Sequence, residues 1–239
     1  MAEQDGHRQH ISRQFNDELS TATAQLLQMG GVVEKQVLAA VEALVERNSG
    51  EADEVIASDK SINEMEVSID DECFRILARR QPAAGDLRLV LAISKAVVDL
   101  ERVGDEATRI ARQAIVLSEQ PADPAVQVNA RRLAAVVIGL LSGALDAFAR
   151  RDADTALGIA RGDGELEAEL GAAVSTLADT MRRSPESVDA AITVMWALRA
   201  LERIASHARN IAEHVIYMVE GVNVRHAKLE SVLDQLRRR

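Results

Sequence analysis

Two related stretches decide the fold: LERVGDEATRIARQAI at 100–115 and LERIASHARNIAEHVI at 201–216. In both, apolar residues recur at steps of three and four, beginning at Leu100 and at Leu201. That spacing is typical of the buried face of a helix in a bundle. Both stretches also open with the same Leu-Glu-Arg tripeptide, so the sequence indicates one helical unit that occurs twice.

The composition favours helices over the whole chain. The 239 residues are 47% hydrophobic, which is enough to bury a sizeable core, yet only 2% are aromatic and only four are proline. Ala, Leu, Val, Ile, Glu and Arg dominate, and this usage is typical of long helices. We therefore predict an all-α protein.

Turn-forming segments divide the chain into six long helices. Gly, Pro, Asn, Asp and Ser cluster at 48–50, 81–82, 121–124, 151–154 and 184–185. Between these breaks we expect helices at 9–47, 51–79, 85–118, 125–150, 153–182 and 186–220.

The proline pair at 121 and 124 lies near the midpoint and marks a repeat boundary. An Arg-Arg-x-Pro signal precedes each of the two related stretches, at 79–82 and at 182–185. We predict two tandem, pseudo-symmetric three-helix bundles, 1–120 and 121–239, with a tail at the end of the second.

Charge and cysteine usage exclude several classes of protein. The formal net charge of −10 disfavours nucleic acid as a partner, and the paired arginines are too scattered along the sequence to predict a basic stripe. No apolar run reaches the roughly 18 residues that direct membrane insertion needs. The N-terminus lacks the apolar segment of a secretory signal, so we expect a cytoplasmic protein. The single cysteine, Cys73, is expected in the core.

Acidic residues stand out on the first repeat. Glu101 and Asp105 lie one turn apart and away from the apolar stripe, with Gly104 between them. Like charges at this spacing cost about 0.2–0.5 kcal/mol and a glycine inside a helix about 1 kcal/mol, so a compensating partner is expected. Carboxylate and amide oxygens suit Mg, Mn or Fe ions, although a solvated acidic face would show the same pattern. A matching line of oxygen-bearing residues is expected on the preceding helix: Asp59, Asn63, Glu66 and Asp70.

The second repeat carries a thinner version of this pattern. Glu202 remains, but Ser206 stands where the first copy has Asp105, and position 170 is Leu. A metal site here is expected to be weaker or empty. The residues that remain as candidate ligands are Asp163, Glu167, Glu202 and Asn210.

Other residues are assigned structural roles. Arg102 is expected to form an ion pair along its own helix, with Asp99 or with Glu106. Trp196 and Tyr217 are expected to pack in the last helix's apolar pattern. The sequence contains no Glu-x-x-His pair, no glycine-rich phosphate loop and no Gly-x-Ser-x-Gly motif, so the usual parts of a di-iron oxidase, a nucleotide hydrolase or an α/β-hydrolase are absent.

Several further segments stand out: ISRQFNDEL at 11–19, MGG at 29–31, ARRQPAAGDLRLV at 78–90, LERVGD at 100–105, and the segments 201–217 and 224–226. Together they resemble the PhoU family of phosphate-specific transport system accessory proteins. The resemblance implies two symmetric three-helix bundles, a cytoplasmic homodimer, and a regulator that is not an enzyme.

The resemblance further implies a negative regulator of the phosphate regulon and of high-affinity phosphate uptake. Such a protein would act as an adaptor between the transporter ATPase PstB and the sensor histidine kinase PhoR, which would recruit it to the inner membrane. Family members can bind surface metal ions (Fe, Mn, Zn or Mg) through Glu or Asp, three residues, then Asp. In the first repeat Glu101 and Asp105 match this motif, but Arg109 stands where the family usually has Asn. In the second repeat Glu202 and Asn210 match the family pattern, whereas Ser206 does not.

Two alternatives stay open at this point. The same carboxylates could serve a metal-dependent phosphate-handling enzyme, or the chain could be a metal-free helical scaffold whose acidic faces dock basic partners.

Overall fold

A computed structural model of the chain describes residues 2–120, 129–162 and 164–224, with the backbone alone for residues 2–12. Within these ranges the chain is helical and contains no strand, which confirms the all-α prediction. The elements are α1 (Ala2–Glu46), α2 (Ser49–Arg80), α3 (Ala84–Ser118), α4 (Ala130–Arg150), α5 (Ala153–Arg161), α6 (Glu165–Arg183), the short 3-10 helix η2 (Pro185–Ser187) and α7 (Val188–Glu220).

The same turn joins the first two helices of each repeat. Arg47 ends α1 and Arg151 ends α4, both in the left-handed conformation with φ of 56° and 54°. The next residue then caps the following helix: the Asn48 side chain accepts from two backbone N–H groups of α2, and Asp152 does the same for α5. Side-chain caps of this kind stabilise a helix by about 1 kcal/mol each.

The helix expected at 153–182 is divided in two. Gly162 and Gly164 adopt positive φ values of 68° and 80°, which end α5 and precede α6. Glycine tolerates this conformation because it has no Cβ, so the break follows from these two residues rather than from a proline or a polar cluster. The start expected at 125 lies outside the described residues, and α4 is described from Ala130.

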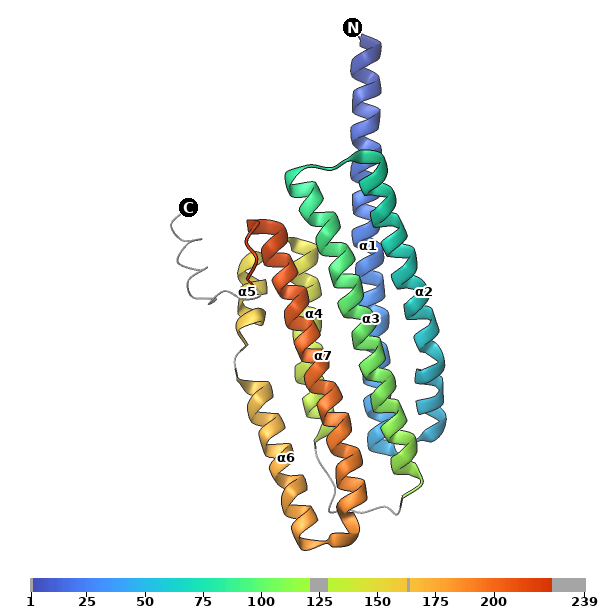
Figure 1. Cartoon of the computed structure of the whole chain (residues 1–239), viewed down its shortest axis with the longest axis vertical. Helices are drawn as coiled ribbons and strands as arrows, with labels where there is room; N and C mark the ends of the chain where they lie inside the picture. Colours follow the sequence, from blue (N-terminus) through green and yellow to red (C-terminus); the bar gives the residue numbers. More distant parts are fainter. Residues whose placement is uncertain (1, 121–128, 163, 225–239) are drawn as a thin grey trace.

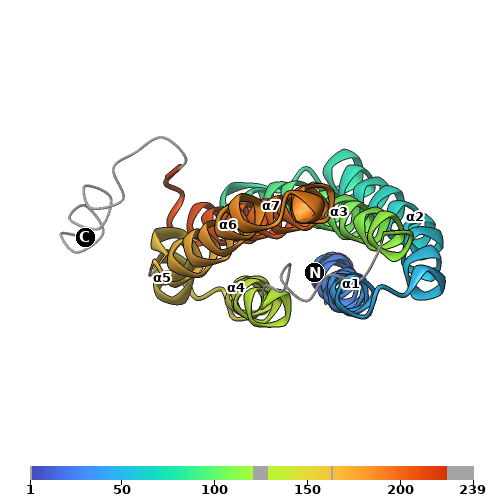
Figure 2. The same cartoon turned by 90° about the horizontal axis from the view of Figure 1, so that it is seen from below.

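The two helix groups lie side by side, with α3 and α7 against each other at the centre (Figure 1). Seen along the bundle, α2, α3, α7 and α6 form one curved layer, and α1 and α4 lie on its inner side (Figure 2). In Figure 1 α3 and α7 run in opposite directions. The contact between α3 and α7 therefore joins the two repeats.

The predicted apolar stripes are the core. Every member of both stripes is fully buried, and Cys73 is buried as expected. Among the described helices, α4 has the length and mean hydropathy (1.7) of a membrane span, but 44% of that window is buried inside the protein, as in a core helix. The stripes comprise Leu100, Val103, Ala107, Ile110 and Ala114 on α3, and Leu201, Ile204, Ala208, Ile211 and Val215 on α7.

Candidate functional site

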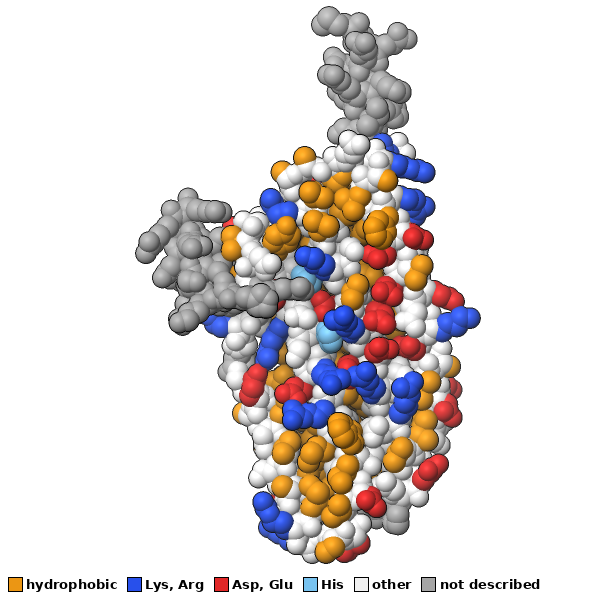
Figure 3. Space-filling view, viewed as in Figure 1, with side chains coloured by type: hydrophobic (Ala, Val, Ile, Leu, Met, Phe, Trp, Pro, Cys, Tyr) orange, Lys and Arg blue, Asp and Glu red, His pale blue; other side chains and the backbone are white. Residues whose placement is uncertain are grey.

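The acidic residues of the first repeat come together where α2 meets α3. Burial raises the pKa of Glu101, and the charges of Asp105, Glu66 and Asp59 raise it further. The pKa of Glu66 is also raised, first by burial and then by Asp70 and Asp105. Figure 3 shows acidic side chains gathered in a column over this part of the molecule. We call these five residues, Asp59, Glu66, Asp70, Glu101 and Asp105, the acidic face.

The structure explains why a glycine stands inside α3. Gly104 is buried against α2, and a Cβ there would lie 3.2 Å from Ile62 Cδ1, 3.2 Å from Gln36 Oε1 and 3.4 Å from Asp59 Oδ1. The oxygens of Gln36 and Asp59 are both buried and have no hydrogen-bond partner among the described residues. The glycine thus allows a close helix contact, with two unpaired oxygens beside it.

These oxygens and the neighbouring carboxylates suit a hard cation. Buried acceptors without a donor are costly, and a cation would satisfy them while it offsets the repulsion between the carboxylates. In the described ranges, however, no group of three or more His, Cys, Asp or Glu side chains is arranged as a metal centre. The acidic face is therefore a loose set of oxygens that would have to draw together around an ion. Asn63, on the same helix, is exposed and donates to Asp59 Oδ2 at 3.4 Å.

The second repeat does not form an equivalent face among its described residues. Glu202 pairs with Arg199 at 2.6 Å, and Ser206 Oγ donates back to the Glu202 backbone carbonyl at 3.0 Å. Arg209 pairs with Glu167 at 2.7 Å. Arginines thus neutralise carboxylates that the sequence suggested as ligands. The remaining candidate, Asp163, lies outside the described residues.

Asn210, suggested as a ligand in the second repeat, instead contributes to a buried cluster between the repeats. Three α7 side chains bond Asp99 of α3: His207 Nδ1 at 2.9 Å and Asn210 Nδ2 at 3.0 Å from Oδ1, and His214 Nε2 at 3.0 Å from Oδ2. Asp99 is only 5% exposed. Burial by itself would raise the pKa of Asp99, but the bonds from His207, His214 and Asn210 hold that pKa well below its usual range. We call this cluster the Asp99 clamp.

A second clamp crosses the same helix pair nearer the other end. Glu106 of α3, also 5% exposed, pairs with Arg109 on its own helix and with Arg203 of α7 at 3.3 Å. The prediction that Arg102 pairs with Asp99 or Glu106 is wrong. His207 and His214 bond Asp99, Arg203 pairs with Glu106, and Arg102 forms no ion pair with either carboxylate among the described residues.

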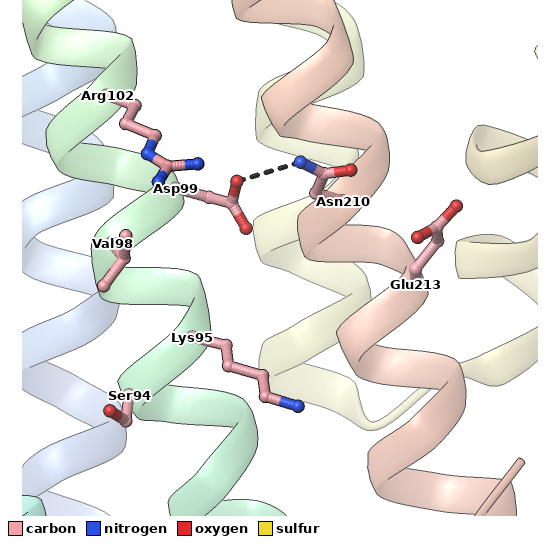
Figure 4. A pocket seen from close by; sticks show the side chains of 7 residues that line it. All are labelled: Ser94, Lys95, Val98, Asp99, Arg102, Asn210 and Glu213. Carbon is pink, nitrogen blue, oxygen red and sulfur yellow. Dashed lines mark hydrogen bonds between the residues drawn. The ribbon is translucent and has the colours of Figure 1, made fainter. Parts of the chain in front are cut away.

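An open groove lies over the Asp99 clamp. Figure 4 shows Lys95 and Arg102 on α3 and Asn210 and Glu213 on α7 along its sides. Lys95 Nζ also lies 5.4 Å from the centre of the Tyr217 ring, a cation–π contact. Sequence reasoning missed both clamps because their partners are some 100 positions apart; the repeated stretches gave the signal that α3 and α7 are equivalent, though not that they touch.

Comparison with known proteins decides the family. The model of the PhoU domain matches twice, at residues 26–114 and 130–215. The chain belongs to the PhoU family. A phosphate-specific transport system accessory protein PhoU homolog from Pseudomonas aeruginosa is 49% identical over 236 residues, which covers 99% of this chain and 98% of the relative. The Escherichia coli accessory protein PhoU is 41% identical over 217 residues, covering 91% of this chain and 90% of the relative.

Solved structures agree. The crystal structure of PhoU from Pseudomonas aeruginosa superposes with a TM-score of 0.82 at 51% identity, covering 87% of this chain and all of that one. PhoU from Streptococcus pneumoniae, a phosphate transport system regulatory protein, gives a TM-score of 0.78 at 27% identity, covering 88% of this chain and 99% of that one. The fold of this chain is thus similar to that of both PhoU structures.

Proposed function

We propose that this chain is a cytoplasmic negative regulator of the phosphate regulon and of high-affinity phosphate uptake. The observation that carries the proposal is similarity over nearly the whole length of proteins named phosphate-specific transport system accessory proteins, at up to 52% identity among those compared. That similarity supports a role in the regulation of phosphate transport. The finer role is that of an adaptor between a PstB-type transporter ATPase and a PhoR-type sensor histidine kinase.

The architecture suits an adaptor. Two bundles packed side by side present long, rigid helix faces on opposite halves of one molecule, so two partners can bind at once (Figures 1 and 2). The family is accessory and regulatory, and the role proposed here requires no turnover. Recruitment by the ATPase and the kinase would bring the protein to the inner membrane.

We also propose that the acidic face binds a surface metal ion, with Glu101, Asp105, Asp59 and Glu66 as the principal ligands. The unpaired oxygens of Asp59 and Gln36 beside Gly104 support this assignment. A bound Mg, Mn, Fe or Zn ion would supply positive charge to this face. The four carboxylates, by binding one ion, would draw α2 and α3 together. Asn63 could turn its amide oxygen toward the acidic face. The family resemblance also suggests a homodimer.

Binding assays test the adaptor role. Purified chain should bind both the immobilised ATPase and the cytoplasmic part of the kinase when phosphate is present. Binding to neither would contradict the proposal. Steady turnover of phosphate esters or polyphosphate by metal-loaded protein would favour an enzyme instead.

Metal content tests the acidic face separately. Mass spectrometry of tag-free protein should find a metal that is lost in Glu101→Ala/Asp105→Ala and retained in Glu202→Ala, because Glu202 already pairs with Arg199. Absence of metal after reconstitution would leave the acidic face as a docking surface.

A further inference from the structure

A second groove lies over the α3–α7 contact, where Glu106 pairs with Arg109 and Arg203. Its volume is about 450 Å³. On α7 it is lined by Trp196, Arg199, Ala200, Glu202 and Arg203, and on α3 by Glu106, Arg109 and Gln113. Neither the acidic face nor the family comparison accounts for it.

Exposed apolar side chains border this groove. Trp196 is 64% exposed, more than any other large hydrophobic side chain in the described part of the chain, so the expectation that it packs is wrong. Ile192, one turn earlier on α7, is 43% exposed, and Val116 on α3 is 42% exposed. Just after the end of α3, Gln120 Nε2 donates to Thr193 Oγ1 of α7 at 3.5 Å, so the end of α3 lies near α7 here. Figure 3 shows hydrophobic side chains gathered over the lower parts of α3 and α7.

Arginines lie directly beside this apolar area. Figure 3 shows a group of basic side chains just above it. The Arg199 and Arg203 side chains are 66% and 62% exposed, and each makes an ion pair with one glutamate. A guanidinium carries five N–H donors, so most donors of both side chains still face solvent. We call the whole area the Trp196 surface: Arg109, Val116, Ile192, Trp196, Arg199 and Arg203.

The equivalent groove of the first repeat provides an internal comparison. At matching positions it has Lys95 for Trp196, Val98 for Arg199 and Asp99 for Ala200. Each groove contains one buried carboxylate, Asp99 in the first and Glu106 in the second, so the two grooves differ in the side chains around it. The matching positions of α3 hold a lysine and a valine in the same kind of helix contact, so helix packing does not require an exposed tryptophan beside an arginine.

We propose that the Trp196 surface docks an acidic amphipathic helix of a partner protein. Two antiparallel helices leave a straight groove, into which a third helix can lay its apolar face. Tryptophan and arginine are the residues that most often dominate protein interfaces. Apolar residues of the partner would cover Val116, Ile192 and Trp196. Its carboxylates would accept hydrogen bonds from the guanidinium groups, because the three arginines of this groove outnumber the two glutamates, Glu106 and Glu202, that pair with them.

Fluorescence tests this proposal directly, because Trp196 is the only tryptophan. The probes are two stapled peptides of about 20 residues, long enough for a stable helix, with leucines on one face and either glutamates or lysines elsewhere. We expect the glutamate peptide to shift Trp196 emission to the blue with saturation, and the lysine peptide to leave it unchanged. Higher salt should weaken the glutamate complex.

Charge reversal provides the matched control. Arg199→Glu/Arg203→Glu should weaken binding of the glutamate peptide about tenfold or more and create binding of the lysine peptide. With labelled peptide, Trp196→Ala should lose binding, whereas Phe74→Ala, on the equally exposed Phe74 of α2, should not. Circular dichroism confirms that each variant is folded.

Two results would overturn the proposal. Equal binding of both peptides, or no saturable change with either, would mean that the surface does not select an acidic helix. Trp196 emission that depends on protein concentration, with a dimer that Trp196→Ala dissociates in sedimentation, would identify a second copy of the chain as the occupant.

Discussion

Replacement of Asp99 by alanine should destabilise the protein more than any other single change of a carboxylate described above. Asp99 accepts three hydrogen bonds from α7 while it is 5% exposed. Its removal takes one hydrogen-bond acceptor from each of His207, His214 and Asn210 at the contact that joins the two repeats. His214 is 3% exposed and has little access to water.

The expected cost follows from these contacts. Hydrogen bonds to a charged group contribute about 1.5–3 kcal/mol each, but three bonds to one carboxylate are not additive. Removal of one partner of a buried charged cluster costs about 3–5 kcal/mol. His207 and Asn210 are partly exposed and can recover bonds to water, so the lower end applies. We expect Asp99→Ala to lower the free energy of unfolding by about 3 kcal/mol.

Urea denaturation followed by circular dichroism at pH 7 measures this cost. Asp71→Ala, at an exposed carboxylate on α2, serves as the control and should stay within about 0.5 kcal/mol of the wild type. Because the folded-state pKa of Asp99 is depressed, its contribution is present above the ordinary aspartate pKa of about 3.9 and is lost as the pH falls further. A cost below about 1 kcal/mol at pH 7, or a difference that persists unchanged in acid, would refute the clamp.

Three further changes test other parts of the structure. Glu101→Gln should raise the melting temperature of metal-free protein by about 1–2 °C at neutral pH, because it removes a charge that its acidic neighbours repel. Since the pKa of Glu101 is raised, the gain should vanish as the pH falls below about 4.3. An equal gain in acid would exclude charge repulsion as the cause. Gly104→Val should lower the free energy of unfolding, measured by urea denaturation, by about 2 kcal/mol because the new side chain overpacks against Ile62. Gly171→Val, in open space on α6, should not lower it in this way. Equal effects of the two changes would contradict the close contact at Gly104. Burial raises the pKa of the Cys73 thiol to about 12, so a thiol reagent at pH 8 should modify Cys73 only in denaturant. Rapid modification of the native protein would show that solvent reaches this part of the core.

Local patterns in the sequence predicted most of the fold. The three- and four-residue steps identified the buried faces of α3 and α7, and the duplicated motif predicted the tandem arrangement. The break between α5 and α6 was missed because two glycines, in a segment that otherwise has the pattern of a helix, adopt conformations with positive φ.

The candidate site was also predicted only in part. The helical spacing placed Glu101 and Asp105 on one face and predicted a matching line of carboxylates on α2, and the structure brings Asp59 and Glu66 of that line close to Glu101. Spacing along one helix could not show which candidate ligands bond residues elsewhere in the fold. Asn210 bonds Asp99 across the repeat interface, and Arg199 pairs with Glu202, so residues that match a ligand pattern have other partners. The arginines of the Trp196 surface come from two helices far apart in sequence, which is why the sequence predicted no basic stripe.

The most direct test of the central claim is expression of a phosphate-starvation reporter in phosphate-replete cells that lack their own PhoU, with and without this chain. The account predicts that the chain restores repression of the reporter and lowers phosphate uptake. Reporter activity that stays fully on, although the protein is present and folded, would contradict a role as a negative regulator of phosphate uptake.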